Sequence, residues 1–294
     1  MKRVAQESLR RRVQPYLEML VRIEVAKAIE QSPDLAAKYL PTSPEQIDLI
    51  VGADEAAPQV ADDGLPLPPP DVWELEGDRD GAPHFDAMVT ALGSAGCTPA
   101  SCRTVLDFGC GSARLLRCWH GHDDRVLRDL WGVDINATSV QWCRTHLSPH
   151  MRFATCTTLP TLPFEDRTFD LVYACSVFTH ISELAESWLL ELRRILRPGG
   201  FAYVTVQDQS YVKAKLAQPA SWHWTSAFVH DHAEILGRLG HGLEIVSLGR
   251  ASKDAMVFHD RGALLESWSR YLDVVGYAEH AYDCQSAVVL RRPV

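Results

Sequence analysis

Apolar residues in the middle of the chain fall into short strand-length runs, which alternate with stretches of helical spacing. The runs predict strands over residues 104–108, 130–134, 152–155, 169–174 and 201–206. The intervening stretches predict helices over residues 85–92, from near Ser112, over 137–146 and over 184–196. Such alternation is typical of an α/β fold, in which a parallel sheet is covered by helices on both faces.

The two ends of the chain and one internal segment depart from this alternation. Residues 1–30 predict an amphipathic helix, and residues 52–83, rich in Gly, Pro, Ala and Asp, predict an extended linker or lid. We therefore divide the chain into an N-terminal helical extension with its linker (1–83) and a main domain (84–294). Residues 207–260 are irregular, apart from a helical stretch near 228–239, and we interpret them as an inserted cap.

The last strands are ambiguous in the pattern. A helix over 262–271 is followed by strand candidates at 272–277 and 287–291. An alternative places the sixth strand at 243–248. We prefer the later pair.

Composition narrows the class of protein. The formal net charge of −9 argues against nucleic acid as the main partner, because phosphate binding needs a basic surface. The eight cysteines form no C-x-x-C pair, so we expect neither a zinc site nor a secreted disulfide framework. No apolar run approaches 18 residues and no signal-peptide pattern is present, so we expect a cytoplasmic protein without a membrane span.

The chemistry concentrates in the run from Val105 to Arg114, where a strand meets a glycine turn. Asp107 lies at the end of the strand, and Gly109 and Gly111 can adopt positive φ and let a ligand approach the backbone. Arg114 stands where the dinucleotide fingerprint needs its third glycine, which disfavours a nicotinamide oxidoreductase.

Four segments carry a resemblance to a known family. V-L-D-F-G-C-G-S-A (105–113) resembles the first motif of class I S-adenosylmethionine-dependent methyltransferases, with Ala113 in place of the usual third glycine. L-W-G-V-D-I-N (130–136) resembles the second motif, and L-R-R-I-L-R-P-G-G (192–200) matches a scaffold element of the family. The S-V-F-T-H-I run (176–181) is similar to that of the small-molecule, methyltransferase-11/25-like subgroup. The resemblance implies a Rossmann-like, mostly parallel seven-stranded sheet that ends in an antiparallel hairpin.

The resemblance also implies a donor site. Asp134 would accept hydrogen bonds from the ribose hydroxyls, although an acid at a helix N-terminus is its alternative explanation. Thr158 stands where an acidic residue is usual, which weakens the expected side-chain contact with adenine. Helix packing is the alternative for Phe85. The implied cofactor-binding residues are Asp107, Gly109, Cys110, Gly111, Asp134, Ile135, Thr158, Leu159, Ser176, Phe178 and Phe85.

On the acceptor side, His180 is the general-base candidate, because an imidazole titrates near pH 7 and can take a proton from a hydroxyl. Its alternative role is to cap the next helix. Core packing is the alternative for the aromatic residues of the cap. The substrate-contact candidates are Tyr211, Trp222, His223, Trp224 and His259.

These observations predict an S-adenosylmethionine-dependent methyltransferase that acts on a hydroxyl or carboxyl oxygen of a small molecule. S-adenosylhomocysteine would be the product. No metal is expected, because the two histidines of His230-Asp-His232 point to different faces of a helix. The alternatives are an N-methyltransferase of an amino sugar or peptide and a non-catalytic protein that binds S-adenosylmethionine. The sequence allows a homodimer and names no acceptor.

Overall fold

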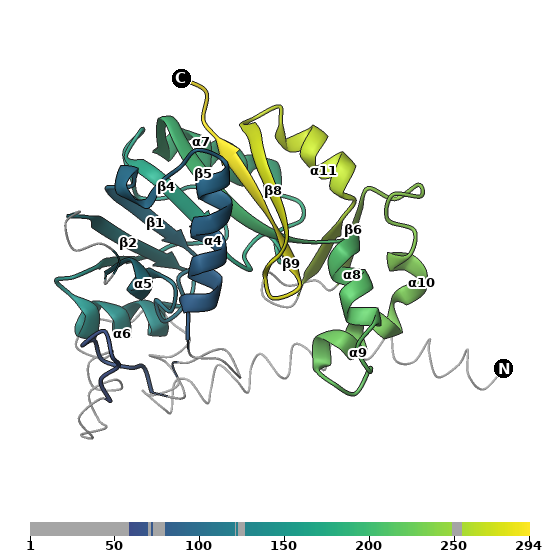
Figure 1. Ribbon diagram of the computed structural model, residues 1–294, viewed down its shortest axis with the longest axis horizontal. Coiled ribbons are helices and arrows are strands. Elements are labelled where there is room, and N and C mark those ends of the chain that lie inside the picture. The colour runs from purple at the N-terminus through teal and green to yellow at the C-terminus, as the bar shows by residue number, and fades with distance from the viewer. Residues whose placement is uncertain (1–58, 70–71, 73–79, 121, 123–126, 249–254) are drawn as a thin grey trace, which may run out of the picture. The chain divides into compact units, whose positions relative to one another are not determined.

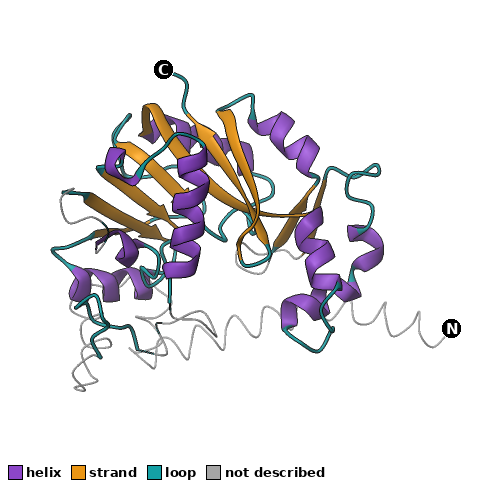
Figure 2. Ribbon diagram, in the orientation of Figure 1, coloured by secondary structure: helices purple, strands orange, loops and turns teal. Residues whose placement is uncertain are grey.

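The computed structural model describes residues 59–69, 72, 80–120, 122, 127–248 and 255–294. The helix expected over 1–30 and much of the linker lie outside the described residues. In the part that is described, a mixed sheet carries helices on both faces (Figures 1 and 2). None of the helices placed there combines the length and the apolar character needed to cross a bilayer.

Most of the predicted strands and helices in the described residues are present, with shifts in their ends. The strands are β1 (Thr104–Phe108), β2 (Asp129–Asp134), β3 (Arg152–Thr155), β4 (Phe169–Ala174), β5 (Leu196–Asp208), β6 (Ile245–Leu248), β7 (Met256–His259), β8 (Asp273–Tyr282) and β9 (Gln285–Arg291). The helices are α4 (Ala82–Ser94), the 3₁₀ turn η1 (Pro99–Ser101), α5 (Leu116–His120), α6 (Ala137–Leu147), α7 (Ala185–Ile195), α8 (Gln209–Leu216), α9 (Trp224–Asp231), α10 (Ala233–Leu236) and α11 (Arg261–Trp268).

The strand order follows the expected topology, and the sheet contains two strands, β6 and β7, beyond the seven expected. β3, β2, β1, β4 and β5 are parallel neighbours in that order, β9 pairs antiparallel with β5, and β8 pairs antiparallel with β9. This arrangement confirms the Rossmann-like sheet and the terminal hairpin. The alternative strand near 243–248 also exists, as β6. It pairs with β7, which lies parallel to the last two residues of β5, so the described sheet has nine strands.

The main apolar core lies between the sheet and helices α7 and α11. On α7, Trp188, Leu189, Leu192 and Ile195 are buried at helical spacing and pack with Leu106 and its neighbours in the sheet. Helix α7 ends at Ile195, before the Pro-Gly-Gly run, because proline cannot donate the next backbone hydrogen bond.

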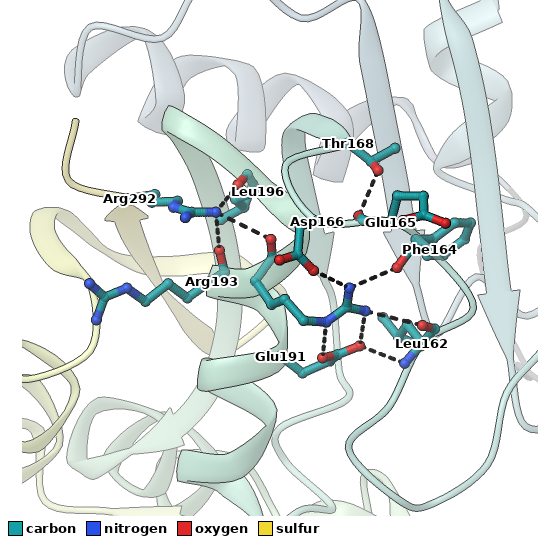
Figure 3. Close-up of polar contacts among 10 residues, drawn as sticks. Leu162, Phe164, Glu165, Asp166, Thr168, Glu191, Arg193, Leu196 and Arg292 are labelled. Carbon is teal, nitrogen blue, oxygen red and sulfur yellow. Dashed lines mark hydrogen bonds and ion pairs between the residues drawn. The ribbon is translucent and has the colours of Figure 1, made fainter.

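Arginine side chains fix the end of α7 and the loop before β4 (Figure 3). Arg194 pairs with Glu191 at 2.7 Å and donates to the carbonyls of Leu162 and Phe164. Arg292, from the end of the chain, donates to the carbonyls of Arg193 and Arg194, where a cation complements the C-terminal end of a helix. These arginines are scaffold.

Residues 207–260, the cap, form their own small core after β5. Its apolar side chains come mainly from the three helices and two strands that are described within this segment: Tyr211, Val212, Val229, Leu236, Leu239, Val246, Met256 and Phe258. The single helix expected over 228–239 is wrong: α9 ends at Asp231 and α10 starts at Ala233. Figure 1 shows α8, α9 and α10 gathered beside β6.

Candidate functional site

The predicted ligand-binding segments follow β1, β2 and β4 at one edge of the sheet. β1 lies between β2 and β4, so the chain leaves β1 on one side and returns on the other. Open α/β sheets bind ligands at such a switch in strand order, beyond the carboxyl ends of the strands. We call this edge, formed by the ends of β1, β2 and β4, the donor edge.

The turn after β1 has a repeated left-handed backbone. Gly109, Gly111 and Ala113 have φ values of 85°, 50° and 66°. A Cβ on Gly109 would lie 2.3 Å from the Val177 side chain, whereas a Cβ on Gly111 would meet nothing within 4 Å. Gly109 is therefore required for close packing against the loop after β4, and Gly111 leaves open space at the turn.

The expected helix start at Ser112 is wrong, because α5 begins only at Leu116. The left-handed conformations of Gly111 and Ala113 break the regular helical dihedrals there. Residues 111–115 form turns instead, and Ala113 occupies the position of the third glycine in the backbone conformation that glycine favours.

Asp134, at the end of β2, is buried and bonded to the turn. Its Oδ2 accepts from the Gly111 N–H at 2.8 Å, and its Oδ1 accepts from the Asn136 N–H at 2.8 Å. A carboxylate offers about four lone-pair sites, so each oxygen can accept one further hydrogen bond. Burial raises the pKa of Asp134 above its usual range, and the backbone hydrogen bonds oppose that shift.

Two large apolar side chains are exposed on the segments that follow β2 and β3. Ile135 is 49% exposed and Leu159 is 63% exposed, and they follow the neighbouring strands β2 and β3. Thr158 is exposed as well. Exposed aliphatic side chains next to a carboxylate that has spare acceptor sites suit a ligand with a flat apolar part and hydroxyl groups.

Asp107, at the end of β1, is almost completely buried. Burial raises its pKa to about 8, and the Asp134 charge adds to the increase, whereas the Tyr173 hydroxyl and the Arg114 charge oppose it. Arg114 is itself buried, and it donates to the Tyr282 hydroxyl at 2.7 Å and to the Asp80 carbonyl at 3.0 Å. Sequence reasoning used Arg114 only to exclude a dinucleotide site and missed this link between the glycine turn and the β8–β9 hairpin.

The loop after β4 places its predicted residues differently. Ser176 lies at the donor edge with φ 59°. Phe178 is fully buried and packs edge-on against Trp268, so the structure places it in the core and away from any open surface. His180 is partly buried, and its Nδ1 lies 2.6 Å from the Ala255 carbonyl oxygen in the cap.

Two further residues predicted to contact the cofactor have packing roles. Phe85 on α4 is buried edge-on against Trp119, in agreement with its alternative explanation. The Cys110 thiol is buried, and a Cβ on Gly132 would lie 2.8 Å from its Sγ. Only the backbone of Cys110 is therefore placed to contact a ligand.

The acceptor-side candidates separate into two groups. Tyr211 and His259 are buried, and the His259 Nε2 has no hydrogen-bond partner among the described residues. Trp222 and Trp224 are 73% and 61% exposed. His223, between them, caps α9 by accepting from the Thr225 N–H. The five residues therefore differ widely in exposure, with two of them buried and three exposed.

The histidines of His230-Asp-His232 bond to separate backbone carbonyls, those of Gln218 and Phe228. Across the parts of the chain that the structure places, no group of three or more His, Cys, Asp or Glu side chains is arranged to hold a metal ion.

Comparison with known proteins agrees with the fold and the glycine turn. A family model described as a methyltransferase domain matches residues 106–204. Probable methyltransferase PMT26 of Arabidopsis thaliana is 34% identical over 125 residues, which make up 42% of this chain and 14% of that protein. The malonyl-[acyl-carrier protein] O-methyltransferase of Salmonella typhimurium is 27% identical over 124 residues, 42% of this chain and 45% of that protein. The chain thus spans less than half the length of either relative.

Among solved structures, the Burkholderia thailandensis 1,6-didemethyltoxoflavin-N1-methyltransferase with bound 1,6-didemethyltoxoflavin and S-adenosylhomocysteine has a TM-score of 0.48 and 14% identity. That match covers 73% of this chain and 80% of the other. The family match begins at Leu106 in β1 and ends at Val204 in β5, so it contains the glycine turn, Asp134 and the loop after β4. Residues 106–204 therefore match a methyltransferase domain, in agreement with the motifs found in this part of the sequence.

Proposed function

We propose that this chain transfers a methyl group from S-adenosylmethionine to an oxygen of a small-molecule acceptor. One observation carries the donor half of the proposal: the buried Asp134 carboxylate is fixed by two backbone N–H groups and keeps acceptor capacity on both oxygens. A ribose diol matches that capacity. Ile135 and Leu159 border the adenine in this proposal, and Thr158 contributes at most a weak polar contact.

The remaining donor contacts follow from charge and position. Asp107 offers an anionic partner for the methionine amine, while Gly109, Gly111 and the Cys110 backbone allow close approach. Ser176 borders the methionine end. Once bound, S-adenosylmethionine supplies an activated methyl group, so the chain's main task is to align the acceptor with it and to exclude water.

Support for an oxygen acceptor comes from the tautomer of His180. A carbonyl oxygen can only accept, so in the neutral ring Nδ1 carries the hydrogen that points to Ala255, and Nε2 is left as the basic nitrogen. A hydroxyl acceptor needs such a base more than an amine does. The related malonyl-[acyl-carrier protein] O-methyltransferase methylates oxygen, which favours the same assignment.

Calorimetric titration tests the donor site. We expect saturable binding of S-adenosylhomocysteine and no heat change with NAD. Asp134→Ala should weaken this binding about 10-fold or more, because hydrogen bonds to a charged acceptor are lost. Asp129→Ala, at the other end of β2, is the matched control and should leave the affinity unchanged. A folded protein that binds no S-adenosylhomocysteine would reject the proposal.

Acceptor screening with methyl-labelled S-adenosylmethionine tests the acceptor half of the proposal, the transfer of the methyl group to an oxygen. With a hydroxyl acceptor, His180→Gln should keep the donor affinity and lower kcat by about 100-fold, the lower end of the range for a general base. An unchanged kcat would leave His180 with only its structural contact to Ala255. Turnover confined to amines would replace the oxygen acceptor by a nitrogen acceptor.

A further inference from the structure

Three polar residues, one in the loop after β4 and one each on β5 and β9, form a closed ring beside the donor edge. The Ser176 N–H, just beyond β4, donates to the Thr205 hydroxyl oxygen of β5 at 2.7 Å. The Thr205 hydroxyl donates to the Gln285 Oε1 of β9 at 2.7 Å. The Gln285 Nε2 donates back to the Ser176 hydroxyl oxygen at 3.0 Å, which completes the ring.

Two of the three members of the ring are buried, so their hydrogen bonds are costly to lose. Thr205 is fully buried and Gln285 is nearly so. A buried polar group that loses its partner retains the cost of its desolvation. The ring also holds the backbone and the side chain of the same residue, so it defines both the position of Ser176 and the direction of its hydroxyl.

Ser176 needs such support because its backbone is left-handed. Its φ is 59°, a conformation that is unfavourable for a residue with a Cβ. The neighbouring packing is tight, since the Val177 side chain fills the space that a Cβ on Gly109 would need. A shift of Ser176 would therefore move the loop that packs directly on the glycine turn.

We propose that Thr205 and Gln285 are positioning residues that hold Ser176 at the methionine end of the donor site. This inference rests on the proposed function, because Ser176 contacts the donor only if the donor binds at this edge. Thr205 and Gln285 themselves touch no ligand in this assignment. The C-terminal hairpin thus takes part in donor binding through Gln285.

The test is a double-mutant cycle between Gln285 and Ser176, read as the dissociation constant of S-adenosylhomocysteine. Gln285→Leu should weaken binding about 5-fold, the effect of one lost hydrogen bond of average strength. In the Ser176→Gly background the same change should weaken binding by less than about 2-fold, because the hydroxyl is gone and glycine tolerates positive φ without support.

Two further variants separate positioning from loss of folding. Gln285→Glu keeps the size of the side chain and removes its N–H donor, so it serves if Gln285→Leu fails to fold. Ser286→Ala, at the adjacent buried position of β9, removes a hydroxyl that bonds to Asp208 and not to Ser176. It should lower the melting temperature and leave the affinity for S-adenosylhomocysteine unchanged.

The outcomes are distinct. Loss of most of the Gln285 effect in the Ser176→Gly background supports the inference. An equal effect in both backgrounds, with normal binding by the unsubstituted protein, overturns the inference and leaves the proposed function intact. Failure of the folded, unsubstituted protein to bind S-adenosylhomocysteine overturns the proposed function and the inference together.

Discussion

The donor edge and the junction of β5 with the cap each bury an aspartate, but the two carboxylates have opposite surroundings. Asp208, the last residue of β5, accepts from the Ser210 and Tyr211 N–H groups and from the hydroxyls of Ser286 and Tyr277. Asp107 is buried to a similar extent, but a single side chain of the described residues, the Tyr173 hydroxyl, is placed to stabilise its carboxylate by hydrogen bonding.

This difference separates a structural acid from a ligand-binding acid. Asp208 has its acceptor capacity filled by the protein, so it holds α8, β8 and β9 together and has little left to offer a ligand. Asp107 ionises only at a cost, which a cationic ligand group would offset. Burial alone therefore does not identify a ligand-binding carboxylate. The distinguishing property is how many of its acceptor sites are already filled by hydrogen-bond donors of the protein.

Replacing Asp208 should have the largest effect on folding. Asp208→Ala removes the N-cap of α8 and leaves several buried donors without a partner. We expect a loss of about 4 kcal/mol in the free energy of unfolding, measured by urea denaturation. Asp86→Ala, on the exposed side of α4, is the control. A loss below about 1 kcal/mol would contradict the structural role of Asp208.

Asp107→Asn should act in the opposite direction. The folded-state pKa of about 8 lies above the unfolded value of 3.8, so the folded protein binds the extra proton between these values. The stability of the unsubstituted protein should therefore fall as pH rises from 4 to 8. Because the asparagine side chain cannot ionise, we expect the free energy of unfolding of the variant at pH 8 to exceed that of the unsubstituted protein by on the order of 3 kcal/mol.

The same substitution should weaken the binding of S-adenosylhomocysteine, because the amine loses its anionic partner. Thermal melts at pH 5 and pH 8, paired with calorimetry, check both effects. A variant that is less stable than the parent at pH 8 would show that Asp107 is structural in the manner of Asp208.

The sequence predicts the donor edge far better than the cap, and the reason is local. Gly109, Gly111 and Asp134 lie at the ends of strands whose apolar runs are visible in the sequence, so their convergence follows from topology. The motif locates the third position of the turn, Ala113. It does not show that the left-handed backbone there delays the start of α5 to Leu116. The burial of Phe178 could not be predicted, because the sequence pattern does not show that its ring packs in the core against Trp268.

The residues that sequence reasoning missed act across long separations. Thr205 and Gln285 are 80 residues apart, and Arg114 and Tyr282 are 168 apart. A threonine in a strand and a glutamine after a turn carry no signal of their own. Only the pairing of β9 with β5 brings them together.

His259 provides a smaller test, with a pH slope opposite to that of Asp107. Burial lowers its pKa to about 4, below the unfolded value of 6.5. The unfolded chain therefore binds the extra proton between pH 6.5 and 4, so stability falls as pH drops through this window. His259→Phe should remove this acid sensitivity, a contribution on the order of 2 kcal/mol at pH 4. Equal acid sensitivity in the variant and the parent would contradict the burial of a neutral imidazole.

The smallest effect is expected at the exposed tryptophans of the cap. Trp222 and Trp224 lie on the surface, whereas Tyr211 packs in the cap's core. Trp222→Ala should change the free energy of unfolding by less than about 0.5 kcal/mol, while Tyr211→Ala should cost about 3 kcal/mol. Neither change should alter the affinity for S-adenosylhomocysteine, because both residues lie outside the donor edge. If Trp222→Ala instead raised KM for an identified acceptor with stability unchanged, the exposed segment would join the acceptor site and Tyr211 would remain structural. A large stability loss at Trp222 would assign this tryptophan to the cap's packing.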